Sequence, residues 1–214
     1  MTTAPRVVRL LMELRQEGIR DTRVLSAIEQ TPREVFVPKT LNDQAYENTA
    51  LPIESGQTIS QPLVVAAMTE ALELTDRMTV LEIGTGSGYQ AAILSALCRR
   101  LYTVERHANL LAGAARCFER LGLTNVVTRV GDGSIGWPEA APFDRIIVTA
   151  AAPEIPPTLL DQLKPDGILV IPVGRVGAGQ ELIKICHTED GYEESAFMPV
   201  RFVPLVAGAP EEGT

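Results

Sequence analysis

Histidine and cysteine are scarce in this chain of 214 residues, which has two histidines and three cysteines. His107 and His187 are too few for a histidine-rich metal site. Cys98, Cys117 and Cys186 lie far apart and form no Cys-x-x-Cys pair. An odd, sparse set without metal-ligand spacing indicates buried thiols in a reducing compartment. We therefore expect a cytoplasmic protein that holds no metal.

Aromatic side chains and positive charge are also low. Aromatic residues make up 5% of the chain, which disfavours a platform for stacking bases. There are 19 Lys and Arg against 27 Asp and Glu, and the net charge of −8 argues against a nucleic-acid-binding protein. No apolar run approaches the roughly 18 residues that cross a bilayer. The first apolar segment meets Glu13 without a cleavage site of small residues, so we expect neither a signal peptide nor a membrane span.

What is present fits one globular domain. With 45% hydrophobic and 21% charged residues, the chain can close a sizeable core, and its length suits a single domain over residues 1–214. We divide it into an N-terminal helical extension with a loop (1–61), an α/β core (62–207) and a tail (208–214). The acidic tail is expected to be frayed and solvated, and the protein to be a monomer.

Two helices are expected near the N-terminus, because apolar residues recur there at helical spacing. These residues are Leu10, Leu11, Leu14, Ile19, Val24, Leu25 and Ile28. Pro32 and Pro38 then break the pattern, and residues 38–61 form a long polar stretch. A segment of that length without secondary structure is usually functional or disordered. Pro62 suits the first position of the next helix.

From residue 78 on, short apolar runs alternate with helical patterns. Five strands are predicted, at 78–83, 101–105, 125–130, 143–150 and 167–173, with helices between them and a short one after Pro153. This alternation is typical of a doubly wound, mostly parallel α/β sheet. The end of the chain differs, because a glycine-rich turn joins further extended segments there. It predicts antiparallel strands along one edge of the sheet.

Three glycines separate the first strand of this sheet from the following helix. Gly84, Gly86 and Gly88 lack Cβ atoms, so the backbone can turn tightly and a ligand can lie directly on it. The helix beyond them begins with free N–H groups. The second strand ends in Glu105, 21 residues after Gly84 (105 − 84), at the spacing of a carboxylate that binds ribose hydroxyls. The alternative interpretation is a tight turn beside an exposed glutamate.

The third strand ends in a second glycine-containing turn. Asp132 could accept a hydrogen bond there from an exocyclic amino group such as that of adenine, with Gly133 beside it. An ordinary turn made from Gly and Asp is the alternative. The pattern Gly-x-Gly-x-Gly differs from the dinucleotide pattern Gly-x-Gly-x-x-Gly, and no Gly-Lys-Ser/Thr sequence of a Walker-type loop is present.

The glycine loop and the strand before it resemble motif I of the class I S-adenosylmethionine-dependent methyltransferases, which have a Rossmann-like fold. The residues that carry the resemblance are Glu82, Gly84, Thr85, Gly86 and Gly88. The resemblance implies that the loop holds the methionine part of S-adenosylmethionine. It also implies that the acid at the end of the second strand holds the ribose.

The segment upstream narrows the resemblance to one family. GQTISQP (56–62), followed by VLEIGTGSGYQAAIL (80–94), is similar to the protein-L-isoaspartate O-methyltransferases. FDRIIVTAAAPEIP (143–156) and a final VRFVPL (200–205) stand in the same order, so the resemblance covers roughly residues 10–207. It implies methylation of L-isoaspartyl residues in damaged proteins and peptides, which starts their repair.

Ser60 is the candidate catalytic residue that the resemblance implies. The acceptor would be a free α-carboxylate, which is ionised at neutral pH because its pKa lies at roughly 3.3–3.9. No strong general base is needed, and a hydroxyl can fix one carboxylate oxygen for in-line attack. Thr58, Ile59 and Gln61 flank the serine and are expected to close over the cofactor. The alternative for Ser60 is a helix cap before Pro62.

Three further residues are expected to bind the substrate. Ala150 and Ala151 follow the fourth strand at the edge where ligands of open sheets bind, and their small side chains leave room for a peptide backbone. Simple loop packing is the alternative. Val206 is expected to line the other side of the groove. Some family members carry a hydroxyl residue where Val206 aligns, so a polar role is in doubt there.

Two other functions remain compatible with the sequence. A methyltransferase for a small molecule or a nucleic acid would share the glycine loop and Glu105, but would leave TISQP (58–62) unexplained. Its nucleic-acid version is disfavoured by the low basic content. A regulatory module that binds a nucleoside without catalysis is the other alternative, and loss of turnover without loss of cofactor binding in a Ser60 variant would distinguish it.

Overall fold

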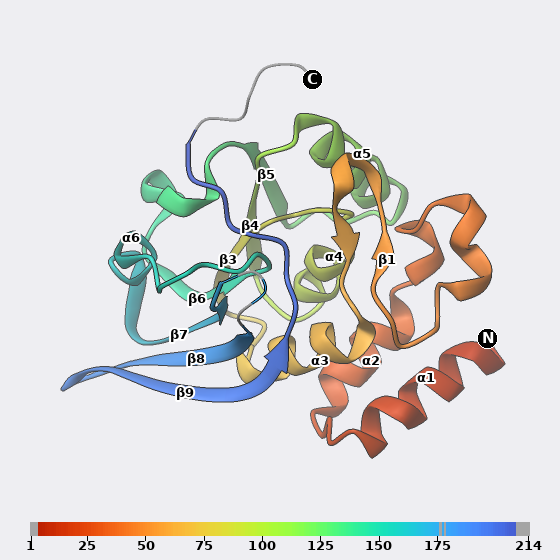
Figure 1. Cartoon of the computed structure of the whole chain (residues 1–214), viewed down its shortest axis with the longest axis horizontal. Helices are drawn as coiled ribbons and strands as arrows, with labels where there is room; N and C mark the ends of the chain where they lie inside the picture. Colours follow the sequence, from red (N-terminus) through yellow and green to blue (C-terminus); the bar gives the residue numbers. More distant parts are fainter. Residues whose placement is uncertain (1–3, 176, 178, 209–214) are drawn as a thin grey trace.

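The computed structural model describes residues 4–175, 177 and 179–208. Within these residues a seven-stranded sheet has the order β5-β4-β3-β6-β7-β8-β9 (Figure 1). The first five strands in this order are parallel, and β8 and β9 continue the sheet in antiparallel pairing. The strands are β3 (Thr79–Ile83), β4 (Arg100–Glu105), β5 (Val126–Val130), β6 (Phe143–Val148), β7 (Leu163–Val173), β8 (Gln180–Thr188) and β9 (Gly191–Val200). The doubly wound α/β fold with antiparallel strands at one edge is confirmed.

Successive residues of the central strands face opposite sides of the sheet, as the period of two requires. In β3 the side chain of Val80 joins one apolar cluster, while Leu81 and Ile83 join the other. All five residues of β3 are buried. A strand covered on both faces needs apolar residues throughout, which explains the continuous run in the sequence.

Helices cover the two faces unequally. Residues of α1 (Pro5–Gln16), α2 (Thr22–Gln30), α3 (Pro62–Ala71), α4 (Tyr89–Ser95) and α5 (Ala108–Arg120) contribute to the first cluster, and α6 (Pro157–Leu160) contributes to the second. The chain moves outward from β3 to β4 and β5, and then returns to place β6 on the other side of β3. The strand order therefore reverses between β3 and β6, where open α/β sheets bind their ligands.

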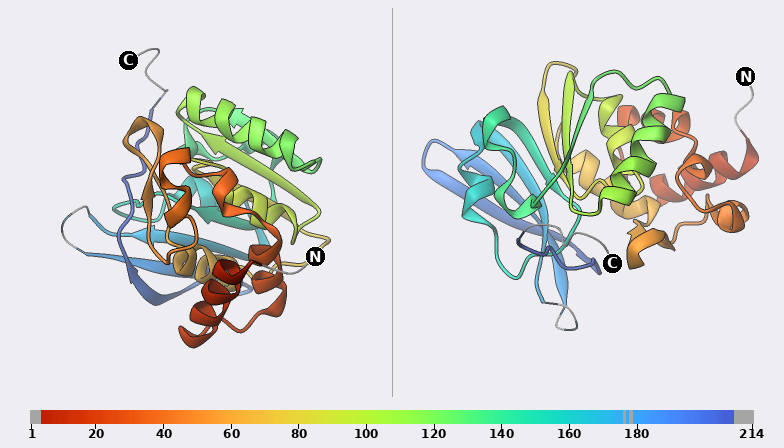
Figure 2. Two further views of the ribbon diagram at one scale, coloured as in Figure 1. Left: turned by 90° about the vertical axis from the view of Figure 1, so that its right-hand side faces the viewer. Right: turned by 90° about the horizontal axis from the view of Figure 1, so that it is seen from above.

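The two expected N-terminal helices are present as α1 and α2. Val7, Leu10 and Leu14 form the buried face of α1, and the Asp21 carboxylate caps α2 by accepting from the Arg23 N–H. The right-hand view of Figure 2 shows these helices at the opposite side of the molecule from the C-terminal strands. They belong to the same apolar cluster as α3, so the extension packs directly on the core.

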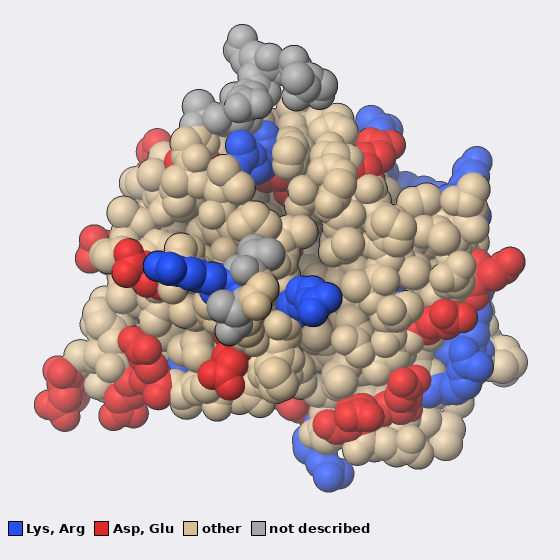
Figure 3. Space-filling view, viewed as in Figure 1, with Lys and Arg blue, Asp and Glu red and all other residues tan. Residues whose placement is uncertain are grey.

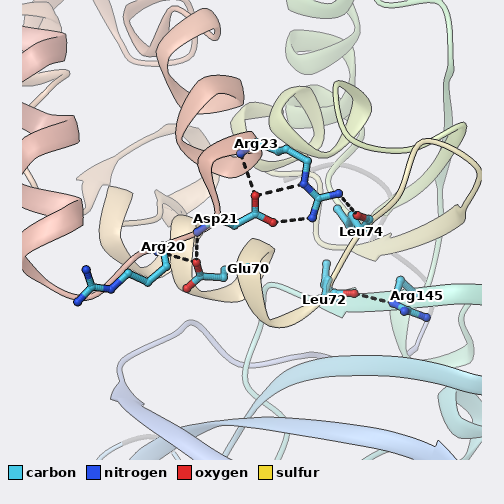
Figure 4. A network of polar contacts seen from close by, with 7 residues as sticks. All are labelled: Arg20, Asp21, Arg23, Glu70, Leu72, Leu74 and Arg145. Atoms are coloured by element: carbon cyan, nitrogen blue, oxygen red, sulfur yellow. Dashed lines mark hydrogen bonds and ion pairs between the residues drawn. The ribbon is translucent and has the colours of Figure 1, made fainter.

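A polar network fastens α2 to the end of α3 (Figure 4). Glu70 Oε1 accepts hydrogen bonds from the backbone N–H groups of Arg20 and Asp21, at 2.7 and 2.5 Å. Arg23 Nη1 donates to the Leu74 carbonyl at 2.8 Å, just beyond α3. The Glu70 carboxylate thus lies at the N-terminal end of α2, and the Arg23 guanidinium binds the Leu74 carbonyl that follows α3. The helix dipoles favour both placements.

The polar stretch at 38–61 contains more regular structure than we expected. It contains the 3-10 helices η2 (Lys39–Gln44) and η3 (Glu54–Gly56), and a small antiparallel pair of β1 (Leu51–Pro52) and β2 (Thr58–Ile59). Another 3-10 helix, η1 (Arg33–Val35), precedes them. Leu51 and Ile59 are buried, so two apolar residues anchor a mostly polar segment.

Three boundaries differ from the sequence prediction. The helix after Pro153 is the single turn α6, and β7 starts at Leu163 rather than at residue 167. Beyond Val200 the chain leaves the antiparallel strand and forms an isolated parallel bridge between Pro204 and Ala151. Val176 and Ala178 of the predicted turn, and residues 209–214 of the tail, lie outside the described residues. In the described part of the chain, no helix combines the length and the apolar character that a membrane span requires.

Candidate active site

A cavity of about 480 Å³ opens at the carboxyl ends of β3, β4 and β6. Its size lies within the roughly 300–1,000 Å³ typical of small-molecule sites. Four parts of the chain form its wall: the β1–β2 segment, the loop after β3 with the start of α4, the ends of β4 and β6, and residues 203–206. Figure 1 shows the chain after β9 passing in front of the sheet beside the β1–β2 pair.

The glycine loop forms the floor of the cavity. Gly84, Gly86 and Gly88 have φ angles of 94°, 54° and 90°, in the left-handed region that favours glycine. A Cβ atom on Gly84 would lie 2.4 Å from Thr149 Oγ1, so a larger residue would displace β6 or fill the site. Gly88 precedes the first turn of α4 at its N-cap position. The loop therefore presents bare backbone to the cavity.

Glu105 lies at the end of β4 with 5% of its surface exposed. Its Oε2 accepts from the Gly86 N–H at 2.8 Å, and its Oε1 accepts from the His107 N–H at 2.9 Å. Each carboxylate oxygen can accept a second hydrogen bond. Glu105 can therefore fix the glycine loop and still offer acceptors to hydroxyl groups in the cavity.

Ser60 follows β2 and lies in the cavity wall with Ile59 and Thr58. Its backbone carbonyl accepts from Arg33 Nη2 at 2.8 Å. Its hydroxyl makes no hydrogen bond to another described residue, and the cavity that Ser60 lines is also lined by the glycine loop and Glu105. A free hydroxyl in that position can donate to an acceptor on a ligand.

Residues 203–206 close the remaining side. The Ala151 N–H donates to the Val203 carbonyl at 2.8 Å, and the Leu205 N–H donates to the Ala151 carbonyl at 2.7 Å. Arg106 Nη1 donates to the Val206 carbonyl at 3.3 Å. The Val206 side chain is 45% exposed at the rim. These backbone bonds attach the end of the chain to the end of β6 and so fix the wall.

A buried polar chain lies beneath the glycine loop. Thr103 Oγ1 donates to Glu82 Oε2 at 2.6 Å, and Thr103 Oγ1 and Thr85 Oγ1 are 2.6 Å apart. Glu82 is fully buried, and burial raises the pKa of its carboxyl to about 8, with the hydrogen bond from Thr103 acting in the opposite direction. Glu82 therefore supports the loop from behind, and its burial favours the protonated form.

Comparison with known proteins identifies the family. The family model for protein-L-isoaspartate(D-aspartate) O-methyltransferase (PCMT) matches residues 6–210. The chain belongs to the protein-L-isoaspartate O-methyltransferase family. A protein of that name from Paramagnetospirillum magneticum is 66% identical over 97% of this chain and 98% of its own length. Another from Parvibaculum lavamentivorans is 58% identical over 96% of this chain and 93% of its own length.

Solved structures agree with this assignment. A protein-L-isoaspartate O-methyltransferase with 30% sequence identity has a TM-score of 0.83, and the match covers 95% of this chain and 67% of that chain. A Plasmodium falciparum beta-aspartate methyltransferase (PCMT) in complex with S-adenosyl-L-homocysteine has a TM-score of 0.81 at 25% identity, covering 92% and 97%. The family resemblance that the sequence suggested is confirmed.

The structure brings most of the predicted site residues into one wall. The cavity is lined by Thr58, Ile59, Ser60, Gly84, Thr85, Gly86, Glu105, Gly133, Ala150 and Val206. Five predicted residues lie outside the lining: Gln61, Glu82, Gly88, Asp132 and Ala151. Their direct contact with a ligand stays a prediction. Three of them have a structural role in the chain: Gln61 and Gly88 precede helices, and Ala151 holds the C-terminal segment.

Asp132 has both carboxylate oxygens engaged. Oδ1 accepts from the N–H and hydroxyl of Ser134, and Oδ2 accepts from the Gly208 N–H at 2.7 Å. These bonds keep the pKa of Asp132 below its usual value despite partial burial. Asp132 thus holds the turn that presents Gly133 and fastens the C-terminal segment. The predicted bond to an exocyclic amino group would add to these contacts.

Several wall residues were missed by the sequence analysis. They include Tyr89, Gln90, His107 and Thr149. Tyr89 and Thr149 directly follow the glycine loop and β6, so their positions at the carboxyl edge could have indicated them. Arg33, which holds the Ser60 carbonyl, carried no signal in the sequence beyond its position between two prolines.

Proposed function

We propose that this chain transfers a methyl group from S-adenosylmethionine to the free α-carboxylate of L-isoaspartyl residues in proteins and peptides, and so initiates their repair. The observation that carries the proposal is the position of the Ser60 hydroxyl. Ser60 lines the same cavity as the glycine loop and Glu105, and its hydroxyl has no hydrogen-bond partner among the described residues. A donor to a carboxylate and a site for a nucleoside thus share one space.

The cavity fits the cofactor that the family implies. Its volume of about 480 Å³ suits a small molecule, and Gly84 and Gly86 contribute backbone without a side chain to its lining. Glu105 would accept from the ribose hydroxyls, and Gly86 and Ser87 would contact the methionine part. Bound there, the cofactor supplies a methyl group on a positively charged sulfur.

Ser60 would act by positioning. A carboxylate needs no base, because it is already ionised at neutral pH. A hydrogen bond from Ser60 to one oxygen orients the other oxygen toward the methyl group, and the apolar surroundings exclude water. Val65, Ile83 and Val104 line the same cavity, and their apolar side chains disfavour water there.

Recognition of many different damaged proteins requires few side-chain contacts. Ala150 lies in the wall with 9% of its surface exposed, and Val206 stands at the rim. Figure 3 shows acidic side chains mainly toward the edges of this face, a few Lys and Arg side chains nearer its middle, and uncharged surface around them. We infer that the substrate is held through its backbone and its isoaspartyl carboxylate rather than through neighbouring side chains.

Replacing Ser60 by alanine tests the proposal. We expect Ser60→Ala to lower kcat/KM for an L-isoaspartyl peptide by about 100-fold, because the acceptor oxygen loses its orientation. Affinity for S-adenosylhomocysteine, measured by calorimetry, should stay within about threefold of wild type. Labelled methyl transfer to a matched pair of L-isoaspartyl and L-aspartyl peptides checks the substrate.

The matched control is Ser195→Ala, on the exposed face of β9, which should leave turnover unchanged. Equal labelling of both peptides by the wild-type protein would contradict the substrate assignment. Full turnover by Ser60→Ala would remove Ser60 from the mechanism. Binding of S-adenosylhomocysteine with no methyl transfer by the wild type would favour a regulatory module.

A further inference from the structure

Arg33 is a buried cation beside the proposed active site. Its exposed surface is 0%, and it starts η1 after Pro32. Its guanidinium donates from Nη2 to the Ser60 carbonyl at 2.8 Å. Nε and Nη1 are buried and have no partner. Removing such a charge from water costs several kcal/mol unless it is paired, so stability alone does not account for an arginine here.

The groups around Arg33 do not neutralise it. The adjacent Glu34 is engaged elsewhere, because it pairs with Arg6 at 2.9 Å and accepts from the Tyr46 hydroxyl. No carboxylate among the described residues forms an ion pair with Arg33. Burial lowers the pKa of the guanidinium, and the tyrosines beside it, Tyr89 and Tyr46, act against that change. The positive charge is therefore left available to a negative group that arrives with a ligand.

Tyr89 connects Arg33 to the cavity. The guanidinium carbon lies 4.6 Å from the centre of the Tyr89 ring, in the geometry of a cation–π contact. Phe36 packs edge-on against the same ring at 5.6 Å between centroids. The Tyr89 side chain lines the cavity, is 2% exposed, and has a buried hydroxyl without a partner. One arginine thus holds both the Ser60 backbone and the Tyr89 ring.

We propose that Arg33 is a positioning residue for methyl transfer, acting through Ser60 and Tyr89 and stabilising the substrate carboxylate electrostatically. The inference rests on the proposed function, because it assigns the carboxylate as the group that the charge serves. Arg33 is not itself part of the cavity lining, so it does not need to touch the substrate. In a medium of low dielectric, a charge acts on a group that it does not touch more strongly than it would in water.

Three variants separate charge from shape. Arg33→Met keeps the length of the side chain without its charge, and we expect kcat/KM for an L-isoaspartyl peptide to fall by about 100-fold. Arg33→Lys keeps the charge and should recover about tenfold of that loss. Tyr89→Phe keeps the ring and removes the unpartnered hydroxyl, and should lower kcat/KM by about tenfold.

The matched control is Arg145→Met. Arg145 is also buried, at 8% exposure, but its guanidinium bonds to backbone carbonyls away from the cavity. All rates are corrected for the folded fraction measured by circular dichroism. Arg33→Met should also move the acid limb of the kcat–pH profile up by about half a unit or more, since the bound carboxylate loses a nearby positive charge. Arg145→Met should not move it.

The outcomes are distinct. If the wild-type protein transfers no methyl group to the peptide, the proposed function fails before Arg33 is tested. If the wild type is active and Arg33→Met equals the Arg145→Met control in kcat/KM, the role of Arg33 is overturned. Equal activity of the Lys and Met variants would also overturn it, because charge would then play no part. Should Arg33→Met fail to fold, Arg33→Lys and Tyr89→Phe decide, with full activity in both contradicting the proposal.

Discussion

Arg145, near the start of β6, and Arg33, behind the cavity, are both buried arginines, but they are partnered differently. Arg145 Nε donates to the Leu72 carbonyl at 2.5 Å (Figure 4), and Nη1 donates to the carbonyls of Asp144 and Asp166 at 2.7 and 3.2 Å. Arg33 has one such bond and two buried nitrogen atoms without partners. The first arginine completes backbone structure, whereas the second leaves donors open beside a ligand site.

The same difference holds for the surroundings of the two arginines. Near the start of the strands, Asp144 accepts from the Thr79 N–H at 2.7 Å and pairs with Lys164 at 2.9 Å. Most buried side-chain atoms without a partner in the described structure belong to residues near the cavity, namely Arg33, Glu82 and Tyr89. Asn42 Oδ1 is the exception. Native proteins satisfy nearly all buried polar groups, so this concentration distinguishes the surroundings of the cavity from the start of the strands.

The largest effect on stability is expected for Arg145→Met. Methionine cannot donate to the three carbonyls, and the bond to the Leu72 carbonyl is buried, so the free energy of unfolding should fall by about 2–5 kcal/mol. Denaturant unfolding of wild type and variant measures this loss. The folded fraction should keep its affinity for S-adenosylhomocysteine. A loss below about 0.5 kcal/mol would contradict the structural role of Arg145 on which its comparison with Arg33 rests.

At the carboxyl ends of the strands, Glu105→Ala should weaken cofactor binding more than it lowers the free energy of unfolding. The change removes the acceptor for the Gly86 N–H and the predicted acceptor for the ribose, so affinity for S-adenosylhomocysteine should fall by about 1–3 kcal/mol, or roughly 5- to 150-fold. Isothermal calorimetry measures the change. Glu139→Ala, an exposed residue paired with Arg129, is the matched control and should bind as wild type does. Wild-type affinity in Glu105→Ala would show that the ribose assignment is wrong.

The sequence predicted the parts of this site that depend on neighbours along the chain. Gly84, Gly86 and Gly88 lie within one turn, and Glu105 follows at a spacing set by one helix and one strand. Such features are local consequences of the fold, because a strand, a tight turn and a helix fix the loop geometry together. The sheet could be predicted for the same reason, since strands and helices alternate regularly.

The parts that were missed depend on contacts between distant residues. Arg33 meets Ser60 across 27 residues, and no periodic pattern indicates that a charged residue between two prolines is fully buried. The bridge between Pro204 and Ala151 requires the chain to leave β9 and return to β6. Glu82 stands in the strand before the glycine loop, where the structure buries it because β3 is covered on both faces, and its predicted contact with the cofactor stays a prediction.

Glu82→Gln gives an effect on stability that depends on pH. The pKa of Glu82 is raised to about 8 in the folded chain, against roughly 4.3 when unfolded. Between these values the folded state binds one proton more than the unfolded state, so this group's contribution to stability is full below the unfolded pKa. It is lost as pH rises through about 8.

Glutamine keeps the shape of the protonated acid and cannot ionise. Relative to wild type, the variant should therefore gain about 1–3 kcal/mol in free energy of unfolding between pH 5 and pH 8. Denaturant unfolding of both proteins at the two pH values measures this change. Asp166→Asn, in an exposed position, is the control and should show no such trend. A constant difference across this range would mean that Glu82 is ionised in the folded chain, and that the carboxylate finds partners beneath the glycine loop. Glu82 would then have partners, as Arg145 does. Only Arg33 and Tyr89 would remain near the cavity as residues with buried polar atoms that lack a partner.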